Sequence, residues 1–248
     1  MQPTQRELAL PIRVDLLPSP PYDDTVILVD VLRTCTVAPI LFENGLERLH
    51  MATSTKLARS LAADSEMVLL GERKGLPPEG FNHGNSPAEL RKLGVGGKRA
   101  VLVSENAPTV VPLLKDAKHL LLGSLYNAEA VVRKAAELTD GNIYIVCSGL
   151  WGQEDLDDTL TAGFLAARLR QLTPETELTG AARLAVTLLH AFPDPLEAFW
   201  RSSSGQYLRA LNLFDDVAVA SLVSQTDFVP SLAETQKHDS GTAYTFTA

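Results

Sequence analysis

The chain of 248 residues carries a formal net charge of −8 and is 45% hydrophobic and 21% charged, a balance that excludes an intrinsically disordered protein. It has no basic run and no stretch near the ~18 consecutive apolar residues of a membrane span, which argues against nucleic acid and membrane partners. The first ten residues lack the features of a signal peptide, and neither Cys35 nor Cys147 has a CxxC partner, so we expect a cytoplasmic protein without a disulfide framework.

Apolar runs of strand length alternate with helical patterns over the first two thirds of the chain. Strands are expected at 12–17, 26–31, 48–51, 67–70, 100–104, 119–122 and 143–147. Helices are expected between them at 34–43, 55–63, 87–93, 108–115 and 128–138. This alternation predicts an α/β fold with a largely parallel or mixed central sheet, because parallel strands need helical crossovers.

The last third changes character and is rich in helices. Helices are expected at 158–171, 175–190, 196–200 and 206–213, followed by short strands at 227–229 and 243–246. A long helical tail argues against a regular eightfold barrel, which remains the second choice. We therefore predict a three-layer α/β/α sandwich, and without an internal repeat or a linker we expect one domain over residues 1–248.

The first candidate functional segment follows the strand expected at 26–31. Asp30 can bind a hard cation such as Mg²⁺ or act as a nucleophile, while Arg33 and the free amides of the helix start can hold a phosphate or a carboxylate. Thr34 and Thr36 add hydroxyl groups. An ordinary helix cap at Asp30 or Thr34, with Arg33 paired on the surface, explains the same residues equally well.

The second segment is the long loop after the strand expected at 67–70. It places Glu72, Arg73 and Lys74 among several glycines and ends at Asn85 and Ser86. A surface loop that ends in a capping box is the plain explanation. Structureless loops this long are uncommon unless they serve a function, so we expect this one to bind an anionic ligand.

Two further segments follow the strands expected at 119–122 and 143–147. Ser124 or Asn127 can cap the next helix, and this role alone explains them. The other segment starts at Ser148 and Gly149 and then has four carboxylates in five positions, at residues 154, 155, 157 and 158. Acidic residues suit the first turn of a helix, but four exceed that need, so we expect at least one of them to bind a metal ion.

These segments, in this order, resemble the 2-phosphosulfolactate phosphatase family over nearly the whole chain. The most specific matches are Asp30-Val31-Leu32-Arg33-Thr34, Gly71-Glu72-Arg73, Gly80-Phe81 and Gly84-Asn85-Ser86-Pro87. Further matches are Gly123-Ser124, Asn127-Ala128 and Cys147-Ser148-Gly149. Counting onward from the last motif places the family's acidic pair on Asp157 and Asp158. One segment departs from the family pattern, since residues 104–109 lack its Thr-Thr-Asn-Gly-Thr stretch.

The resemblance implies Mg²⁺-dependent hydrolysis of a phosphate monoester of a small carboxylic or sulfonic acid, in a three-layer α/β/α fold. Catalytic roles are predicted for Asp30, Arg33, Glu72 and Arg73. Metal binding is predicted for Asp30, Glu72, Asp157 and Asp158. Substrate binding is predicted for Thr34, Thr36, Asn85, Ser86, Ser124, Asn127, Ser148 and Gly149.

Other functions stay open on the sequence alone. The altered stretch at 104–109 leaves a non-catalytic binder of a phosphorylated or dicarboxylate metabolite as the alternative. A metal-independent hydrolase that uses Cys147 is a third, weaker reading. The expected partner is a small phosphorylated acid, and the sequence leaves the number of subunits open, with a homodimer as one option.

Overall fold

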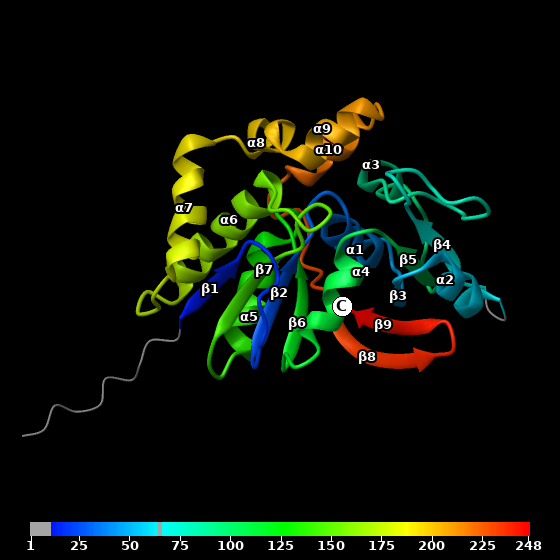
Figure 1. Cartoon of the computed structure of the whole chain (residues 1–248), viewed down its shortest axis with the longest axis horizontal. Coiled ribbons are helices and arrows are strands. Elements are labelled where there is room, and N and C mark those ends of the chain that lie inside the picture. The colour runs from blue at the N-terminus through cyan, green and yellow to red at the C-terminus, as the bar shows by residue number, and fades with distance from the viewer. Residues whose placement is uncertain (1–10, 64–65) are drawn as a thin grey trace, which may run out of the picture.

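A nine-stranded mixed sheet forms the centre of the protein (Figure 1). The computed structural model describes residues 11–63 and 66–248, so the first ten residues, where no signal peptide is expected, lie outside the described residues. The strands are β1 (Ile12–Asp15), β2 (Thr25–Val29), β3 (Arg48–Ala52), β4 (Val68–Gly71), β5 (Arg99–Val103), β6 (His119–Gly123), β7 (Ile143–Cys147), β8 (Ser231–His238) and β9 (Gly241–Thr247).

The sheet consists of two parallel blocks that an antiparallel hairpin joins. Its order is β1-β7-β2-β6-β8-β9-β3-β5-β4. Strands β1, β7, β2 and β6 are parallel to one another, as are β3, β5 and β4. Three consecutive pairings, β6 with β8, β8 with β9 and β9 with β3, are antiparallel. The strands of the second block therefore run antiparallel to those of the first. The hairpin joins β6 through one Cα partner pair, Leu121 with Ser231.

Helices cover both faces of this sheet. They are α1 (Thr34–Glu43), α2 (Thr55–Ala62), α3 (Pro87–Leu90), α4 (Ala107–Val110), α5 (Ala128–Leu138), α6 (Leu156–Leu172), α7 (Gly180–Ala191), α8 (Pro195–Arg201), α9 (Ser203–Ala210) and α10 (Phe214–Ala220), with a 3-10 turn η1 (Val111–Leu114). Helices α5 and α6 pack on one face of the first block, and α2 packs on the second block. Helix α1 packs on the face of the sheet opposite to α5 and α6. The three-layer α/β/α sandwich is therefore confirmed.

Helix α1 is apolar all round and is buried between the two blocks of the sheet. Its residues Leu41 and Phe42 share one core cluster with Leu28 of β2 and with Met51 and Leu102 of the second block. Neighbouring strands twist by roughly 20–25°, so the five pairings between β2 and β5 rotate the sheet by roughly 100° or more. The sheet thus curls around α1 and brings together carboxyl ends that a flat sheet would hold at opposite edges.

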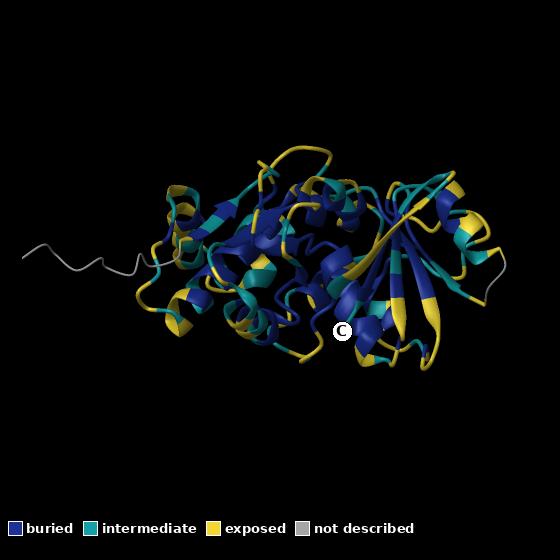
Figure 2. Ribbon diagram, turned by 90° about the horizontal axis from the view of Figure 1, so that it is seen from below, coloured by how far each residue is buried: buried dark blue, intermediate teal, exposed yellow. Residues whose placement is uncertain are grey.

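The burial pattern explains several of the elements. Every residue of β2 is buried, as expected of a strand covered on both faces, whereas the middle of β8 is exposed (Figure 2). Ser86 accepts the Glu89 N–H at 3.2 Å and caps α3, with Pro87 at its first position. None of the described helices is long and apolar enough to cross a membrane.

The helix-rich final third is confirmed, but three of its details differ from the sequence prediction. The strand predicted at 227–229 is wrong, because these residues have no regular structure and Pro230 follows them. Strand β8 and helix α10 were not predicted. The sequence of β8 is largely polar, and its strand form depends on seven pairings with β9 rather than on a buried apolar face.

Candidate functional site

Asp30 directly follows β2 and is only 3% exposed. Its Oδ2 accepts the Ala107 N–H of α4 at 2.8 Å, and its Oδ1 lies 3.4 Å from the Thr34 nitrogen. Burial raises the pKa of Asp30, and the nearby charge of Glu72 raises it further, against the effect of these hydrogen bonds. Asp30 therefore joins the starts of two helices and is a buried carboxylate at the carboxyl end of its strand.

The start of α1 does not offer the free amides that the sequence suggested. The Thr34 amide faces Asp30 Oδ1, and the Cys35 amide donates to the Asp30 carbonyl oxygen at 2.8 Å. The N-cap residue is Arg33, whose side chain makes no capping hydrogen bond. An anion at this point has to be held by side chains instead.

Arg33 is buried and forms an ion pair across the fold. Its Nη1 lies 2.8 Å from Asp216 Oδ2, and its Nη2 donates to the Gly75 carbonyl at 2.9 Å. Asp216 Oδ1 accepts the Ser86 hydroxyl at 2.5 Å. Arg33 therefore links three parts of the chain, namely the segment after β2, the long loop after β4 and helix α10. Ser86 joins the same network through its hydrogen bond to Asp216.

Glu72 follows β4 and holds two loops in place. Its Oε2 accepts the Gly75 N–H at 2.8 Å and its Oε1 accepts the Glu105 N–H at 2.9 Å. Gly75 has a φ of +76°, and a Cβ there would lie 2.4 Å from Leu211 Cδ1, so only glycine fits this turn without strain. Glu72 thereby connects the carboxyl ends of β4 and β5.

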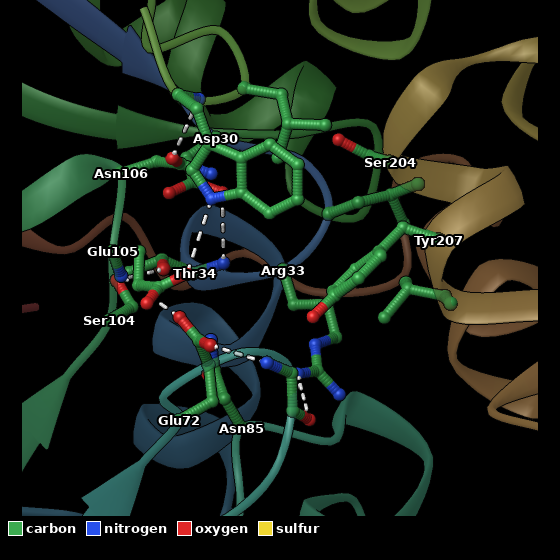
Figure 3. A pocket seen from close by; sticks show the side chains of 15 residues that line it. Asp30, Arg33, Thr34, Glu72, Asn85, Ser104, Glu105, Asn106, Ser204 and Tyr207 are labelled. Carbon is green, nitrogen blue, oxygen red and sulfur yellow. Dashed lines mark hydrogen bonds between the residues drawn. The ribbon is translucent and has the colours of Figure 1, made fainter. Parts of the chain in front are cut away.

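Hydroxyl and amide groups complete the polar side of the site (Figure 3). The hydroxyls of Thr34 and Ser104 lie 2.9 Å apart and link α1 to the end of β5. Asn85 is 2% exposed, and its Oδ1 is buried without a hydrogen-bond partner. An orphaned buried acceptor is costly, so Asn85 Oδ1 has the character of a ligand-binding atom.

Several of these groups line one cavity of about 40 Å³ whose wall also includes residues of α9. In the described part of the chain the lining residues are Asp30, Leu32, Arg33, Thr34, Glu72, Gly75, Asn85, Ser104, Glu105, Asn106, Leu150, Trp151, Ser204, Tyr207 and Leu208. Five predicted site residues, Asp30, Arg33, Thr34, Glu72 and Asn85, thus meet in one pocket.

The predicted acidic pair lies outside this pocket. Asp158 Oδ1 accepts the Val31 N–H at 2.9 Å, and its Oδ2 accepts the Gly149 N–H at 3.0 Å and the Ser148 hydroxyl at 3.2 Å. Burial and the charge of Asp30 raise the pKa of Asp158 to about 8. Burial also raises the pKa of Asp157 well above its usual range. Asp158, Ser148 and Gly149 connect the loops after β2 and β7.

The remaining predicted residues have partners elsewhere. Arg73 donates to the carbonyls of Glu72 and Thr53, at 3.2 and 2.9 Å, and does not line the described pocket. The Thr36 hydroxyl donates to the Val31 carbonyl at 2.8 Å. Asn127 Oδ1 accepts the Ser124 N–H at 3.0 Å, while its Nδ2 donates to the Leu122 and Phe228 carbonyls. In this structure, therefore, the polar groups of these residues bond to other parts of the protein.

A hard cation fits the polar side of the pocket. Asp30, Glu72 and the Asn85 amide oxygen supply oxygen ligands, and a carboxylate oxygen that accepts one N–H keeps a second lone pair. Mg²⁺ typically uses one or two carboxylates together with waters and substrate oxygens. Among the described residues, no group of three or more histidine, cysteine or acidic side chains could hold a metal ion alone. The donor set therefore suits a weakly held, hydrated cation.

Several lining residues carry no role in the sequence prediction. Ser104 ends the strand predicted at 100–104, and Glu105 and Asn106 directly follow it, so the rule that ligands collect at carboxyl ends could have assigned them. Trp151 lies in the segment after the strand predicted at 143–147, so the same rule could have assigned it, whereas Tyr207 had no such signal. Their place in the pocket depends on how the loop after β7 and helix α9 pack over the sheet.

Comparison with known proteins identifies the family of this chain. A family model described as 2-phosphosulpholactate phosphatase matches residues 12–235. Proteins called probable 2-phosphosulfolactate phosphatase from Thermus thermophilus and Deinococcus radiodurans are 39% and 37% identical, each over 89% of this chain and over 94% and 92% of their own lengths. One from a Synechococcus species is 32% identical over 85% of this chain and 90% of its own length. The chain therefore belongs to the 2-phosphosulpholactate phosphatase family.

Proposed function

We propose that this protein is a Mg²⁺-dependent phosphatase that hydrolyses a phosphate monoester of a small organic molecule. The main support is the pocket whose described lining residues include Asp30, Glu72, a single cation, Arg33, and Asn85, whose buried amide oxygen has no hydrogen-bond partner. The relatives are named for a phosphatase, which supports the same reaction class. In the reaction a water oxygen bonds to phosphorus, the P–O ester bond breaks, and the water proton ends on the released alcohol.

Different side chains of the pocket would serve different parts of this reaction. Arg33 donates two of its five N–H groups to Asp216 and Gly75, which leaves three for phosphoryl oxygens. The hydroxyls of Thr34 and Ser104 supply neutral donors. Asp30 is placed to orient the attacking water and accept its proton, or to attack phosphorus itself. Phosphoryl transfer needs mainly positioning and charge neutralisation, and this set provides both.

Mg²⁺ would be held by Asp30 and Glu72 with the Asn85 amide oxygen. When bound, it would neutralise negative charge on the phosphoryl oxygens. Asp157 and Asp158, which the sequence placed in the metal site, have no part in this proposal, because neither lines the described pocket.

Replacing Asp30 with asparagine tests the proposal. Asparagine keeps the shape but removes the charge, so we expect phosphate release from a panel of small phosphomonoesters with Mg²⁺ to fall by ~10³-fold or more. Melting in EDTA should change little or rise, since a buried charge near Glu72 disappears. Asp227→Asn is the matched control, because Asp227 is exposed and forms an ion pair with Arg133 at the surface.

The non-catalytic binder makes a different prediction in the same assay. Tight binding of a phosphomonoester without any phosphate release over a long incubation would favour the binder. An Asp30→Asn protein that stays active and still responds to Mg²⁺ would contradict the role of Asp30.

A further inference from the structure

Arg33, the one cation among the described lining residues, is anchored at both of its terminal nitrogens (Figure 3). Its Nη1 donates to Asp216 Oδ2 at 2.8 Å, and its Nη2 donates to the Gly75 carbonyl at 2.9 Å. A guanidinium is planar and rigid, so two anchors on different nitrogens fix the plane of the whole group. The N–H groups that remain therefore point in set directions before any anion arrives.

Asp216 of α10 is only 1% exposed and does not line the pocket that contains Arg33. Its Oδ1 accepts the Ser86 hydroxyl at 2.5 Å and lies 3.4 Å from the Ala88 nitrogen. Its Oδ2 accepts Arg33 Nη1. Both oxygens are thus occupied by the protein itself, and Asp216 reaches the pocket only through Arg33.

Neither helix capping nor stability explains why this carboxylate is buried. An acidic residue in the first turn of α10 favours the helix dipole, but the neighbouring Asp215 does so while exposed. The side chains of Arg33 and Asp216 are 4% and 2% exposed, and the attraction within such a buried pair barely offsets the loss of hydration. What the buried carboxylate does provide is a fixed acceptor for Arg33.

We propose that Asp216 is a positioning residue that holds Arg33 in the orientation needed to bind the phosphoryl group. Ser86 in turn holds Asp216 through its hydroxyl. Gly75 supplies the second anchor, and its own N–H is held by Glu72 Oε2 at 2.8 Å. The inference rests on the proposed phosphatase function for the identity of the anion, and it assigns to α10 a part in that function.

Binding of inorganic phosphate in the presence of Mg²⁺ tests this role without turnover. Calorimetry should give a dissociation constant roughly tenfold or more higher for Asp216→Ala, because a guanidinium with one anchor turns away from the anion. Asp216→Asn should retain most of the affinity, since its amide oxygen can accept from Arg33 while its amide N–H donates to the Ser86 hydroxyl. Asp215→Ala is the matched control, because Asp215 is exposed on the same helix.

A double-mutant cycle separates positioning from a general loosening of the fold. Arg33→Ala removes the group through which Asp216 acts, so adding Asp216→Ala should raise the dissociation constant no further. A purely structural Asp216 would add its own loss to that of Arg33. Because a lone buried charge can unfold a protein, Arg33→Gln, which keeps an N–H donor for Asp216, serves as a second background, and urea unfolding checks each variant.

Chemical rescue provides a readout that a structural role would not move. Guanidinium ion at a non-denaturing concentration should restore part of the phosphate affinity of Arg33→Ala, because Asp216 and the Gly75 carbonyl can still hold it. It should not rescue the Arg33→Ala/Asp216→Ala protein. Potassium chloride at the same ionic strength is the control.

Turnover shows the same dependence in the proposed reaction. For the best ester of the phosphomonoester panel, kcat/KM should fall by ~10²-fold in Asp216→Ala, as expected when a catalytic group loses its alignment. Asp216→Asn should recover most of this loss.

The outcomes separate the inference from the proposed function. If no ester releases phosphate but phosphate binding still depends on Asp216 through Arg33, the proposed function fails and the positioning role stands. If esters are hydrolysed but Asp216→Ala binds phosphate as the wild type does, the inference is overturned and the function stands. The inference is also overturned if the two losses simply add, or if guanidinium ion rescues both proteins equally or neither of them.

Discussion

Asp158 is a buried carboxylate whose protonation changes with pH near neutrality. Burial and the charge of Asp30 raise its pKa from 3.8 to about 8. Between these two values the folded protein keeps a proton that the unfolded chain releases. The stability that this proton provides is complete below about pH 4 and is lost as the pH rises through about 8.

Replacing Asp158 with asparagine should flatten the dependence of stability on pH. The wild-type free energy of unfolding should decline between pH 5.5 and 7.5 by up to about 1.4 kcal/mol per pH unit from this group alone, and the variant should lose that slope. Urea unfolding in EDTA across this range measures both slopes. Equal slopes for the two proteins would contradict the assignment.

The affinity for Mg²⁺ should also depend on pH through Asp30. Burial raises the pKa of Asp30, so a cation must displace a proton from it more often at lower pH. We expect the Mg²⁺ concentration that gives half-maximal activity to fall as the pH is raised. A half-maximal concentration that does not change with pH would show that Asp30 does not bind the metal.

At the scale of elements, Asp155 links α6 to α9 through hydrogen bonds. It caps α6 by accepting the Leu156 N–H, and its two oxygens also accept the N–H groups of Ser203 and Ser204 and the Ser204 hydroxyl, each at 2.8 Å. The sequence offered Asp155 as one of four acidic residues near a helix start, of which at least one was expected to bind a metal ion. Its second function depends on α9, which returns to this point 48 residues later.

Asp155→Ala should therefore loosen α9 and the pocket together. The change leaves three donors of α9 and the cap of α6 without an acceptor, which should cost about 2–4 kcal/mol of stability. KM should rise, because Ser204 and Tyr207 of α9 line the pocket. Urea unfolding and steady-state kinetics measure the two effects. Glu154→Ala, a change at the neighbouring exposed carboxylate, should alter neither.

The local elements were predictable where the apolar pattern is strong. The prediction of α1 at 34–43 matches the structure, because its apolar residues surround the whole helix. The start of α7 was placed five residues early, since four of the five residues at 175–179 carry polar side chains that suit a helix or a loop equally. Asp30, Arg33 and Glu72 were found because polar residues follow apolar strands. Tyr207 was not, because its meeting with Trp151 is a tertiary contact.

At the scale of the whole molecule, a shared core connects the two blocks of the sheet. Phe246 of β9 is fully buried in the cluster that also contains α1, β2, β3 and β5. The predicted single domain therefore has a physical test. A common core should make the two blocks unfold in one step.

Unfolding in urea should follow one transition by two probes. Fluorescence reports on Trp151 and Trp200, and circular dichroism reports on all elements, so their midpoints should coincide. Phe246→Ala should lower the free energy of unfolding by about 3–5 kcal/mol and keep the midpoints together. Phe228→Ala serves as the exposed control. Separate midpoints would indicate that the blocks are independent domains.

The position of the β8–β9 hairpin in the chain has a consequence during protein synthesis. The hairpin joins β6 to β3, yet it follows every other strand that the structure describes. While a ribosome is still adding residues 231–247, the facing edges of β6 and β3 have no neighbour to pair with. Exposed strand edges readily pair with strands of other chains. The nascent protein therefore passes through a stage prone to aggregation, which ends only when its final strands are delivered.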